Sequence, residues 1–455
     1  MPCVTIAPEE LQACLEVLAR VEELPSEHPD AVAVRHATAR IFKAVKEQRR
    51  AARRAAVADN DRAVLARTAT AAPGRIDDET SGVQLLPAAA GVTAGTLIKA
   101  RPCYQCKRKY TQVDAFYHQL CPACATLNRA RREARTDLRG RRALLTGGRA
   151  KIGMYIALRL LRDGAETTIT TRFPRDAARR FKEMPDSEQW LHRLDIVGID
   201  LRQPSQVVAL ADAVAADGPL DILINNAAQT VRRSPEAYAP LVAGESGPLP
   251  AGVRVRELGA AHDLHPSTTL ALTIDGSRAV EATIDAAGLI PDQVDHNSWT
   301  QTVQEIDPVE MLEVQLCNST APFILISRLR ASLAASAAAR SYIVNVSAME
   351  GSFGRGYKGP GHPHTNMAKA ALNMLTRTSA REMFETDRIL MTSVDTGWIT
   401  DERPHTTRTR LAQEGFHAPL DLADGAARVY DPIVMGEAGE DLYGVFLKDY
   451  APASW

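Results

Sequence analysis

The chain has 455 residues, a formal net charge of −1 and 45% hydrophobic residues. This length exceeds that of a typical single domain, and the composition suits a globular protein with a sizeable core. The balanced charge gives no whole-chain attraction to nucleic acid or to an acidic membrane surface. No stretch reaches the roughly 18 apolar residues of a membrane helix, and the start lacks the layout of a secretory signal. We therefore expect no membrane partner and a cytoplasmic location.

Residues 1–95 are expected to form a helical region followed by a linker. Leu11 and Leu15 recur at helical spacing, and a long charged helix rich in Ala and Arg is predicted over 31–66. Residues 68–95 are rich in Ala, Gly, Thr and Pro, which is typical of a linker. A solvated packing arm is the favoured interpretation of the charged helix, ahead of an interaction surface.

Two Cys-x-x-Cys pairs lie fourteen residues apart in a segment, 96–140, that is expected to form a small module. The pairs are Cys103 with Cys106 and Cys121 with Cys124. In a reducing compartment such pairs indicate metal before disulfide, and four thiolates complete a closed tetrahedral site for a structural Zn²⁺. The arrangement resembles a treble-clef zinc finger. Basic residues beside the pairs could meet nucleic acid, but a role in structure or protein contact is favoured.

From residue 141 to the end, apolar strands alternate with amphipathic helices. This order predicts an α/β domain with a Rossmann-type, doubly wound parallel sheet. An insert is expected at about 230–308, where runs at 267–275 and 277–288 indicate a strand and a helix of a small lid. The predicted strands of the sheet are 143–146, 167–171, 196–201, 222–225, 342–346, 390–394 and 443–447.

A glycine-rich turn follows the first of these strands, in RRALLTGGRAKIG. Glycines there let the backbone approach a pyrophosphate whose charge lies at a helix amino terminus. The turn resembles the T-G-x-x-x-G-x-G loop of the short-chain dehydrogenase/reductase family. Thr146, Gly147 and Gly153 match that loop, whereas Lys151 replaces its middle glycine.

Further landmarks of this family follow in the family's order, so the resemblance covers about 141–455 without the insert. It implies an oxidoreductase with a small-molecule substrate and a nicotinamide cofactor, and family members are often homo-oligomers. Asn318, in NSTAPF, matches the family's active-site asparagine. The cofactor-binding residues that the resemblance implies are Gly147, Lys151, Ile152, Gly153, Asp200, Leu201, Asn226, Ala227, Lys369, Gly397 and Ile399.

The charges near the end of the second strand indicate which cofactor is bound. No acidic residue follows that strand where it could bind a ribose diol, and Arg172 stands there instead. Arg172 and Arg149 could pair with a 2′-phosphate, which favours NADP(H) over NAD(H). Lys151 would add positive charge beside the pyrophosphate, but it lacks the conformational freedom of glycine.

The catalytic pattern departs from the family's Ser, Tyr and Lys. Thr365 stands at the tyrosine position of Y-x-x-x-K, and the serine position falls on Ala348, with Ser347 one residue earlier. An aliphatic hydroxyl is a far weaker acid than a phenol, so Thr365 cannot simply take the tyrosine's role. The resemblance implies that Lys369 holds the ribose and that Asn318 positions a water or the lysine. Ser347 or Thr365 would then hydrogen-bond the substrate.

Three interpretations of the missing tyrosine stay open. Tyr357 or His364, in the loop before Thr365, could supply the proton. The site could instead catalyse something other than simple carbonyl reduction. In the third case the domain binds NADP(H) without turnover, as a scaffold or sensor that contacts a partner or nucleic acid. An oxidoreductase acting on a carbonyl or alcohol is the favoured hypothesis.

Overall fold

The computed structural model describes residues 6–72, 75, 91–258, 285, 287–292, 294–354 and 356–455. The chain forms two compact units, one of residues 1–64 and 96–100, and one of residues 65–95 and 101–455. The strand expected at 267–275 and most of the helix expected at 277–288 lie outside the described residues. Among the described helices, none combines the length and apolar composition that a membrane crossing requires.

The first unit is helical. Helix α1 spans Pro8–Glu22 and helix α2 spans Pro29–Leu65, close to the predicted 31–66. Alanine and arginine, both strong helix formers, dominate α2, and most of its side chains are exposed. The Asp61 carboxylate of α2 accepts hydrogen bonds from the backbone N–H groups of Ile98 and Lys99.

The cysteine pairs belong to a small module of two strands and one helix. Strands β1 (Thr93–Pro102) and β2 (Lys109–Asp114) form a two-stranded sheet, and α3 (Pro122–Glu133) follows the second cysteine pair. Arg132 of α3 makes a two-pronged ion pair with Asp421, with N–O distances of 2.6 and 2.8 Å. Buried, bidentate pairs of this kind fix orientation, so α3 packs in a defined way on the larger domain.

Nine strands form one sheet in the described part of the chain, in the order β11-β10-β9-β8-β6-β3-β4-β5-β7. Neighbours pair in parallel, except that β10 and β11 are antiparallel. The predicted doubly wound parallel sheet is thereby confirmed. The strands are β3 (Arg142–Leu145), β4 (Glu166–Thr171), β5 (Leu194–Gly198), β6 (Ile222–Asn225), β7 (Arg254–Glu257), β8 (Ser341–Ser347), β9 (Ile389–Asp395), β10 (Phe446–Lys448) and β11 (Ala451–Ala453).

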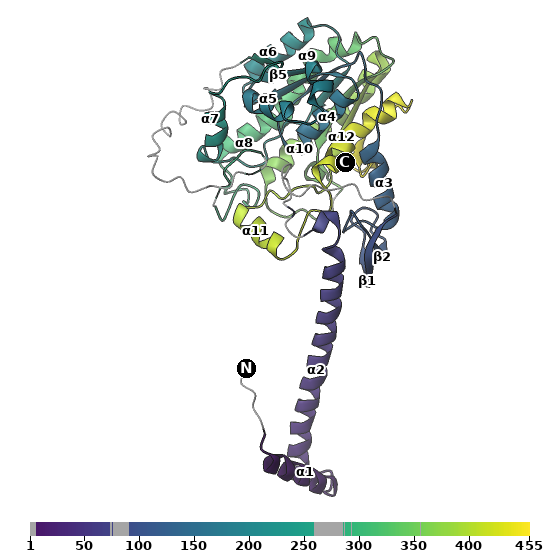
Figure 1. Ribbon diagram of the computed structural model, residues 1–455, viewed down its shortest axis with the longest axis vertical. Coiled ribbons are helices and arrows are strands. Elements are labelled where there is room, and N and C mark those ends of the chain that lie inside the picture. Colours follow the sequence, from purple (N-terminus) through teal and green to yellow (C-terminus); the bar gives the residue numbers. More distant parts are fainter. Residues whose placement is uncertain are drawn as a thin grey trace. The chain divides into compact units, whose positions relative to one another are not determined.

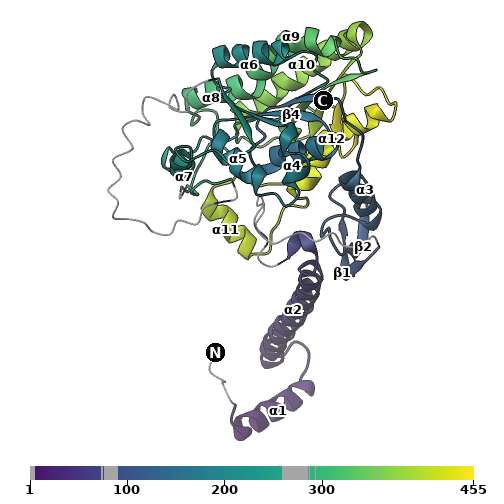
Figure 2. The same ribbon diagram turned by 45° about the horizontal axis from the view of Figure 1, so that its top comes forward.

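Helices cover both faces of the sheet (Figures 1 and 2). Helices α4, α5 and α12 share one apolar core with the sheet, and α6, α9 and α10 share the other. Because helices cover both faces, every residue of a strand such as β8 is buried. The helices are α4 (Lys151–Arg162), α5 (Pro174–Lys182), α6 (Pro204–Ala216), α7 (Ala239–Gly244), α8 (Pro308–Gln315), α9 (Ala321–Ala334), α10 (Pro363–Asp387), α11 (His405–Gln413) and α12 (Leu422–Glu437).

Strands β5 and β10 differ from the sequence prediction by more than one residue at an end, and β7 and β11 were not predicted. The strand expected at 196–201 is β5, which ends at Gly198 because its pairing with β4 ends there. The strand expected at 443–447 starts only at Phe446, since Gly444 has a left-handed φ of 65° that strands do not use. Strand β7, which pairs with β5 at the sheet edge, comes from the insert and was not predicted.

Candidate functional site

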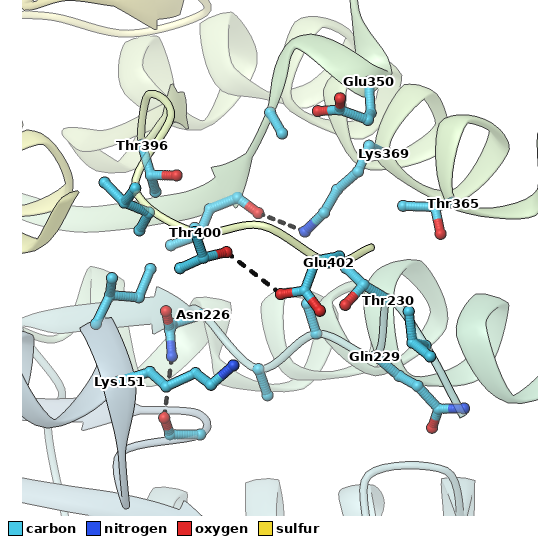
Figure 3. Close-up of a pocket in the computed structure, with 18 of the residues that line it drawn as sticks. Lys151, Asn226, Gln229, Thr230, Glu350, Thr365, Lys369, Thr396, Thr400 and Glu402 are labelled. Carbon is cyan, nitrogen blue, oxygen red and sulfur yellow. Dashed lines mark hydrogen bonds between the residues drawn. The ribbon is translucent and has the colours of Figure 1, made fainter. Parts of the chain in front are cut away.

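A cavity of about 1090 Å³ opens at the carboxyl ends of β3, β6, β8 and β9. The chain order reverses between β3 and β6, which is where open α/β sheets bind ligands. Its walls come from the turn after β3, the segment after β6, the amino end of α10 and the loop after β9 (Figure 3). These segments carry most of the candidate residues that the sequence predicted.

The glycine turn packs so tightly that side chains are excluded from it. A Cβ atom at Gly153 would lie 1.9 Å from the Gly147 carbonyl oxygen, and one at Gly147 would lie 2.9 Å from the Ala227 Cα. Asn226 closes the turn, because its Nδ2 donates to the carbonyl oxygens of Thr146 and Gly147 at 3.0 Å. The positive end of the α4 dipole therefore lies at a closely packed turn that can receive a phosphate group.

Lys151 is the first residue of α4 and has a left-handed φ of 53°. Such a conformation costs a residue other than glycine about 1 kcal/mol or more. The side chain lines the cavity together with Ile152 and Gly153 (Figure 3). The replacement of the middle glycine thus puts a cationic side chain in the cavity wall beside the turn.

The far end of the cavity holds the residues expected near an adenosine. Arg172 follows β4 and lies over the Tyr238 ring, with its guanidinium carbon 4.7 Å from the ring centroid. Asp200 forms a close ion pair with Arg202. Burial opposes ionisation of Asp200, but hydrogen bonds from Arg202 outweigh it and hold the pKa of the carboxyl below its usual value. Leu201 lines the same part of the cavity.

Arg149 also lines this part of the cavity, but its guanidinium is engaged within the protein. It pairs with Asp176 at 2.6 Å and donates to the Ala287 carbonyl oxygen at 2.7 Å. Burial lowers the pKa of Arg149, although Asp176 acts in the opposite direction. Both arginines expected at a 2′-phosphate lie over the Phe173 ring, and Arg172 also lies over the Tyr238 ring.

Lys369 and Thr365 lie one turn apart on α10 and both line the cavity (Figure 3). The Lys369 Nζ donates to the Val346 carbonyl oxygen at 2.9 Å. Burial lowers the pKa of Lys369 to about 8, although Cys317 and Glu350 act in the opposite direction. This lysine can therefore change its charge close to neutral pH.

Two hydroxyl groups beside Lys369 are buried without a hydrogen-bond partner among the described residues. They are the Ser347 Oγ at the end of β8 and the Thr365 Oγ1 on α10. Both residues line the cavity. Because a buried hydroxyl without a partner costs free energy, such groups are suited to hydrogen bonding with a bound molecule.

Asn318 lies in a π-helical turn, Leu316–Thr320, between α8 and α9. Its Oδ1 accepts from the Gln229 N–H at 2.7 Å, and its Nδ2 donates to the Gln229 carbonyl oxygen at 2.8 Å. The side chain thereby fixes the segment after β6 that forms one wall of the cavity. This backbone contact was not part of the sequence prediction.

The loop before α10 contains the two candidate proton donors. Tyr357 lines the cavity and is 77% exposed, so its ring can move. His364 is buried, is not among the residues that line the cavity, and its ring nitrogens have no partner among the described residues. Burial lowers its pKa, although Glu310 opposes the shift. Tyr357 is thus the better placed of the two.

Glu402, in the loop after β9, is a site residue that the sequence did not reveal. Its carboxylate points into the cavity and accepts a hydrogen bond from the Thr400 hydroxyl at 3.3 Å (Figure 3). The guanidinium of Arg233 lies 3.8 Å away. Burial opposes ionisation of Glu402, but Lys151 and Arg233 outweigh it and hold the pKa of this carboxyl below its usual value.

The four cysteines of the small module come together in one cluster, with sulfur atoms within 4.8 Å of one another. The Sγ atoms of Cys106 and Cys121 are 3.7 Å apart. Tetrahedral Zn–S bonds of about 2.3 Å separate the sulfurs by about 3.8 Å, so this donor set fits zinc. The Cys121 N–H also points at the Cys103 Sγ, at 3.3 Å.

Comparison with known proteins finds a match to the family profile described as short chain dehydrogenase, over residues 141–240. The uncharacterized protein R665 of Acanthamoeba polyphaga mimivirus is 31% identical over 356 residues, which are 73% of this chain and 71% of that protein. D-erythrulose reductase of Gallus gallus is 37% identical over 92 residues, which are 20% of this chain and 33% of that enzyme.

Solved structures with a similar chain path include two with a bound cofactor. The NADPH-bound carbonyl reductase from chicken fatty liver has 19% identity and a TM-score of 0.45, covering 72% of this chain and 98% of its own. The RhlG/NADP active-site complex of Pseudomonas aeruginosa has 20% identity and a TM-score of 0.44, covering 68% and 95%.

Proposed function

The chain belongs to the short-chain dehydrogenase/reductase family, and on this premise we propose that it is an NADP(H)-dependent oxidoreductase acting on a carbonyl or alcohol. The observation that carries the proposal is that the tightly packed glycine turn and Lys369 line the same cavity. Such a turn suits a pyrophosphate, and Lys369 matches the lysine that holds the ribose in this family.

The residues that would hold the cofactor follow the cavity from one end to the other. Arg172 would bind the 2′-phosphate, and Asp200 and Leu201 would flank the adenine. Gly147, Lys151, Ile152 and Gly153 would meet the pyrophosphate, with Asn226 and Ala227 behind them. Lys369 would bind the ribose, and Gly397 and Ile399 would lie at the nicotinamide. When bound, this cofactor supplies or accepts the hydride.

The protein's own part in the reaction is to hold the substrate and move a proton. The buried hydroxyls of Ser347 and Thr365 would hydrogen-bond the substrate oxygen, which satisfies both groups. The charge of Lys369 would stabilise negative charge that develops on this oxygen. Tyr357 is the proposed proton donor, because it is a phenol that lines the cavity and belongs to an exposed loop segment.

We further propose that Cys103, Cys106, Cys121 and Cys124 bind one structural Zn²⁺. Four sulfur ligands leave no open coordination position, so the ion would stabilise the module and not act on the substrate. Such a site needs reduced thiols, which supports the proposed cytoplasmic location. Homo-oligomer formation stays a prediction that the mass in solution can test.

A scaffold that binds NADP(H) without turnover is the second candidate. It is favoured by one observation, namely that Thr365 stands where the family has its catalytic tyrosine. In that case the zinc module or the basic helices would contact a partner protein, with nucleic acid as the less favoured partner.

Cofactor titration tests the first part of the proposal. The fluorescence of NADPH and NADH should show tighter binding of NADPH, and Arg172→Ala should raise the Kd for NADPH about tenfold without changing that for NADH. Arg175→Ala is the matched control, because Arg175 is bonded to the Gly247 carbonyl and does not line the cavity. Tighter binding of NADH would contradict the assignment.

Turnover distinguishes the enzyme from the scaffold. NADPH oxidation with a panel of aldehydes and ketones should be lost in Lys369→Ala, while NADPH binding falls by less than about tenfold. The scaffold would be favoured if the chain binds NADPH but neither reduces any carbonyl with NADPH nor oxidises any alcohol with NADP.

A further inference from the structure

A tyrosine of the cysteine module reaches the cofactor cavity of the Rossmann domain. Tyr104 lies between Cys103 and Cys106, and its side chain lines the cavity. Its hydroxyl oxygen accepts a hydrogen bond from the Trp398 N–H at 2.8 Å. The module and the cavity are therefore joined by a direct contact between residues 294 positions apart in the chain.

The contact falls on the loop after β9, whose conformation is tightly constrained. Gly397 has a left-handed φ of 76°, and a Cβ atom there would lie 2.7 Å from Leu420 and 3.6 Å from the Tyr104 hydroxyl oxygen. The Trp398 ring packs on Phe416, with the ring centroids 5.3 Å apart. The Trp398 amide is thus held by Tyr104 of the module, and its ring is held by Phe416.

The position of Tyr104 depends in turn on the fold of the first cysteine pair. The Cys103 N–H bonds to the Arg108 carbonyl oxygen at 2.9 Å, and the Lys107 N–H bonds to the Cys103 carbonyl oxygen at 3.1 Å. The Tyr104 N–H bonds to the Gln119 carbonyl oxygen at 2.8 Å. A metal ion on the four sulfurs would fix this loop, because it joins both cysteines that flank Tyr104 to the second pair.

We propose that Tyr104 is a positioning residue for the nicotinamide end of the cofactor site, and that zinc binding to the cysteine cluster holds it in place. The ion fixes the loop from Cys103 to Cys106, Tyr104 fixes the Trp398 amide, and Gly397 to Ile399 keep the shape that the cofactor needs. The cofactor part rests on the proposed function above. The link between the cysteine cluster and the loop after β9 does not.

The link acts at one end of the cavity only. Arg172 lies in the loop after β4, and Asp200 and Leu201 lie in the loop after β5, on the other side of β3 from β9. Loss of the Tyr104 contact should therefore weaken a ligand that fills the whole cavity and leave a ligand of the adenosine end unaffected. NADPH and adenosine 2′,5′-bisphosphate are such a pair of probes.

The test uses the full chain with Tyr104→Phe, and Tyr110→Phe as its control. The Tyr110 hydroxyl bonds to the His118 carbonyl oxygen within the module, at 3.0 Å, so the control removes one hydrogen bond without reaching the cavity. Amide hydrogen exchange of residues 396–400, zinc content and the Kd of both probes are measured. A third sample is the wild-type chain after removal of zinc with a chelator.

In Tyr104→Phe we expect faster exchange at Trp398, unchanged zinc content and a Kd for NADPH raised about fivefold, as for one lost hydrogen bond. The Kd for adenosine 2′,5′-bisphosphate should not change, and Tyr110→Phe should match the wild type in both Kd values. Removal of zinc should speed exchange at 396–400 in the wild type. In Tyr104→Phe, zinc removal should cause little further increase in the exchange rate at 396–400, because the hydrogen bond from Trp398 is already lost.

Unchanged exchange at Trp398 in Tyr104→Phe would overturn the proposal, as would equal weakening of both probes. Exchange at 396–400 that does not respond to zinc removal would overturn the role of the metal. If the wild-type chain binds neither NADPH nor the bisphosphate, the proposed function is wrong. Exchange at Trp398 then decides by itself whether the module positions the loop.

Discussion

Lys369 on α10 donates a hydrogen bond to the Val346 carbonyl oxygen on β8, at 2.9 Å, and lies one turn beyond Thr365 (Figure 3). The ammonium group is thereby fixed in a cavity wall where water has little access. Burial lowers its pKa to about 8 from 10.5, and the facing groups, Cys317 and Glu350, only partly oppose this shift. The charge of Lys369 is therefore sensitive to pH in a range where an exposed lysine is not.

The first prediction is that turnover falls as the pH rises through about 8. Above that pH the lysine is neutral and no longer stabilises negative charge on the substrate oxygen. In Lys369→Arg the fall should move above pH 10, because guanidinium keeps its proton. The pH dependence of kcat/KM between about pH 6 and 10.5 is the measurement. A wild-type profile that stays flat through pH 9.5 would show that the charge of Lys369 is not needed.

The second prediction concerns the cost of burying this charge. Because the folded-state pKa is depressed, the cost is present in full below about pH 8 and disappears as the pH rises toward 10.5. Lys369→Met should raise the free energy of unfolding at pH 7 by about 1 to 2 kcal/mol, after the lost bond to Val346 is subtracted. Urea denaturation at pH 7 and 10 should show this gain only at pH 7. Destabilisation at both values would contradict the argument.

The third prediction is that Lys151→Gly weakens NADPH binding. The substitution removes a cation from the expected pyrophosphate position, so the Kd should rise about fivefold at low salt and depend less on ionic strength. Stability should change by less than about 1 kcal/mol, because relief of the left-handed φ offsets the greater freedom of the unfolded chain. Lys182→Ala, at the exposed end of α5, is the control. Tighter binding would mean that close backbone approach outweighs the charge.

The parallel sheet could be predicted from the sequence because strands such as β3, β6 and β9 are buried on both faces and contain short apolar runs. Strand β6 was predicted to the residue, and the cysteine cluster followed from spacing alone. Strand β7 could not be found in this way, since three of the four residues in its sequence, RVRE, are charged and its side chains are at most half-buried at a sheet edge. It pairs with β5 through backbone groups, which leave little trace in side-chain pattern.

The candidate site could be predicted only where a local pattern marks it. The glycine turn and Lys369 lie in such patterns, and both line the cavity. Glu402 and Tyr104 carry no local signal, because each enters the cavity through contacts with distant segments. The contact of Asn318 with the Gln229 backbone likewise depends on how α8 and α9 pack beside β6.

The fourth prediction tests the proton donor through the tyrosine position of the family. Thr365→Tyr places a phenol one turn from Lys369, and the adjoining cavity gives its ring space. Because Tyr357 would reach the substrate only through loop movement, a phenol on α10 is the better placed proton donor. It should raise the rate of simple ketone reduction by about tenfold or more, since a well-placed general acid contributes about 100-fold or more. Tyr357→Phe should lower the wild-type rate at least tenfold.

The double variant separates the two phenols. With Thr365→Tyr in place, Tyr357→Phe should have little further effect, because the proton then comes from α10. The Kd for NADPH should stay within about threefold in all three variants, which excludes loss of cofactor binding as the cause of any rate change. If Tyr357→Phe alone leaves the wild-type rate unchanged, Tyr357 is not the proton donor. The reaction would then take its proton from solvent or from Lys369, whose pKa of about 8 permits that role.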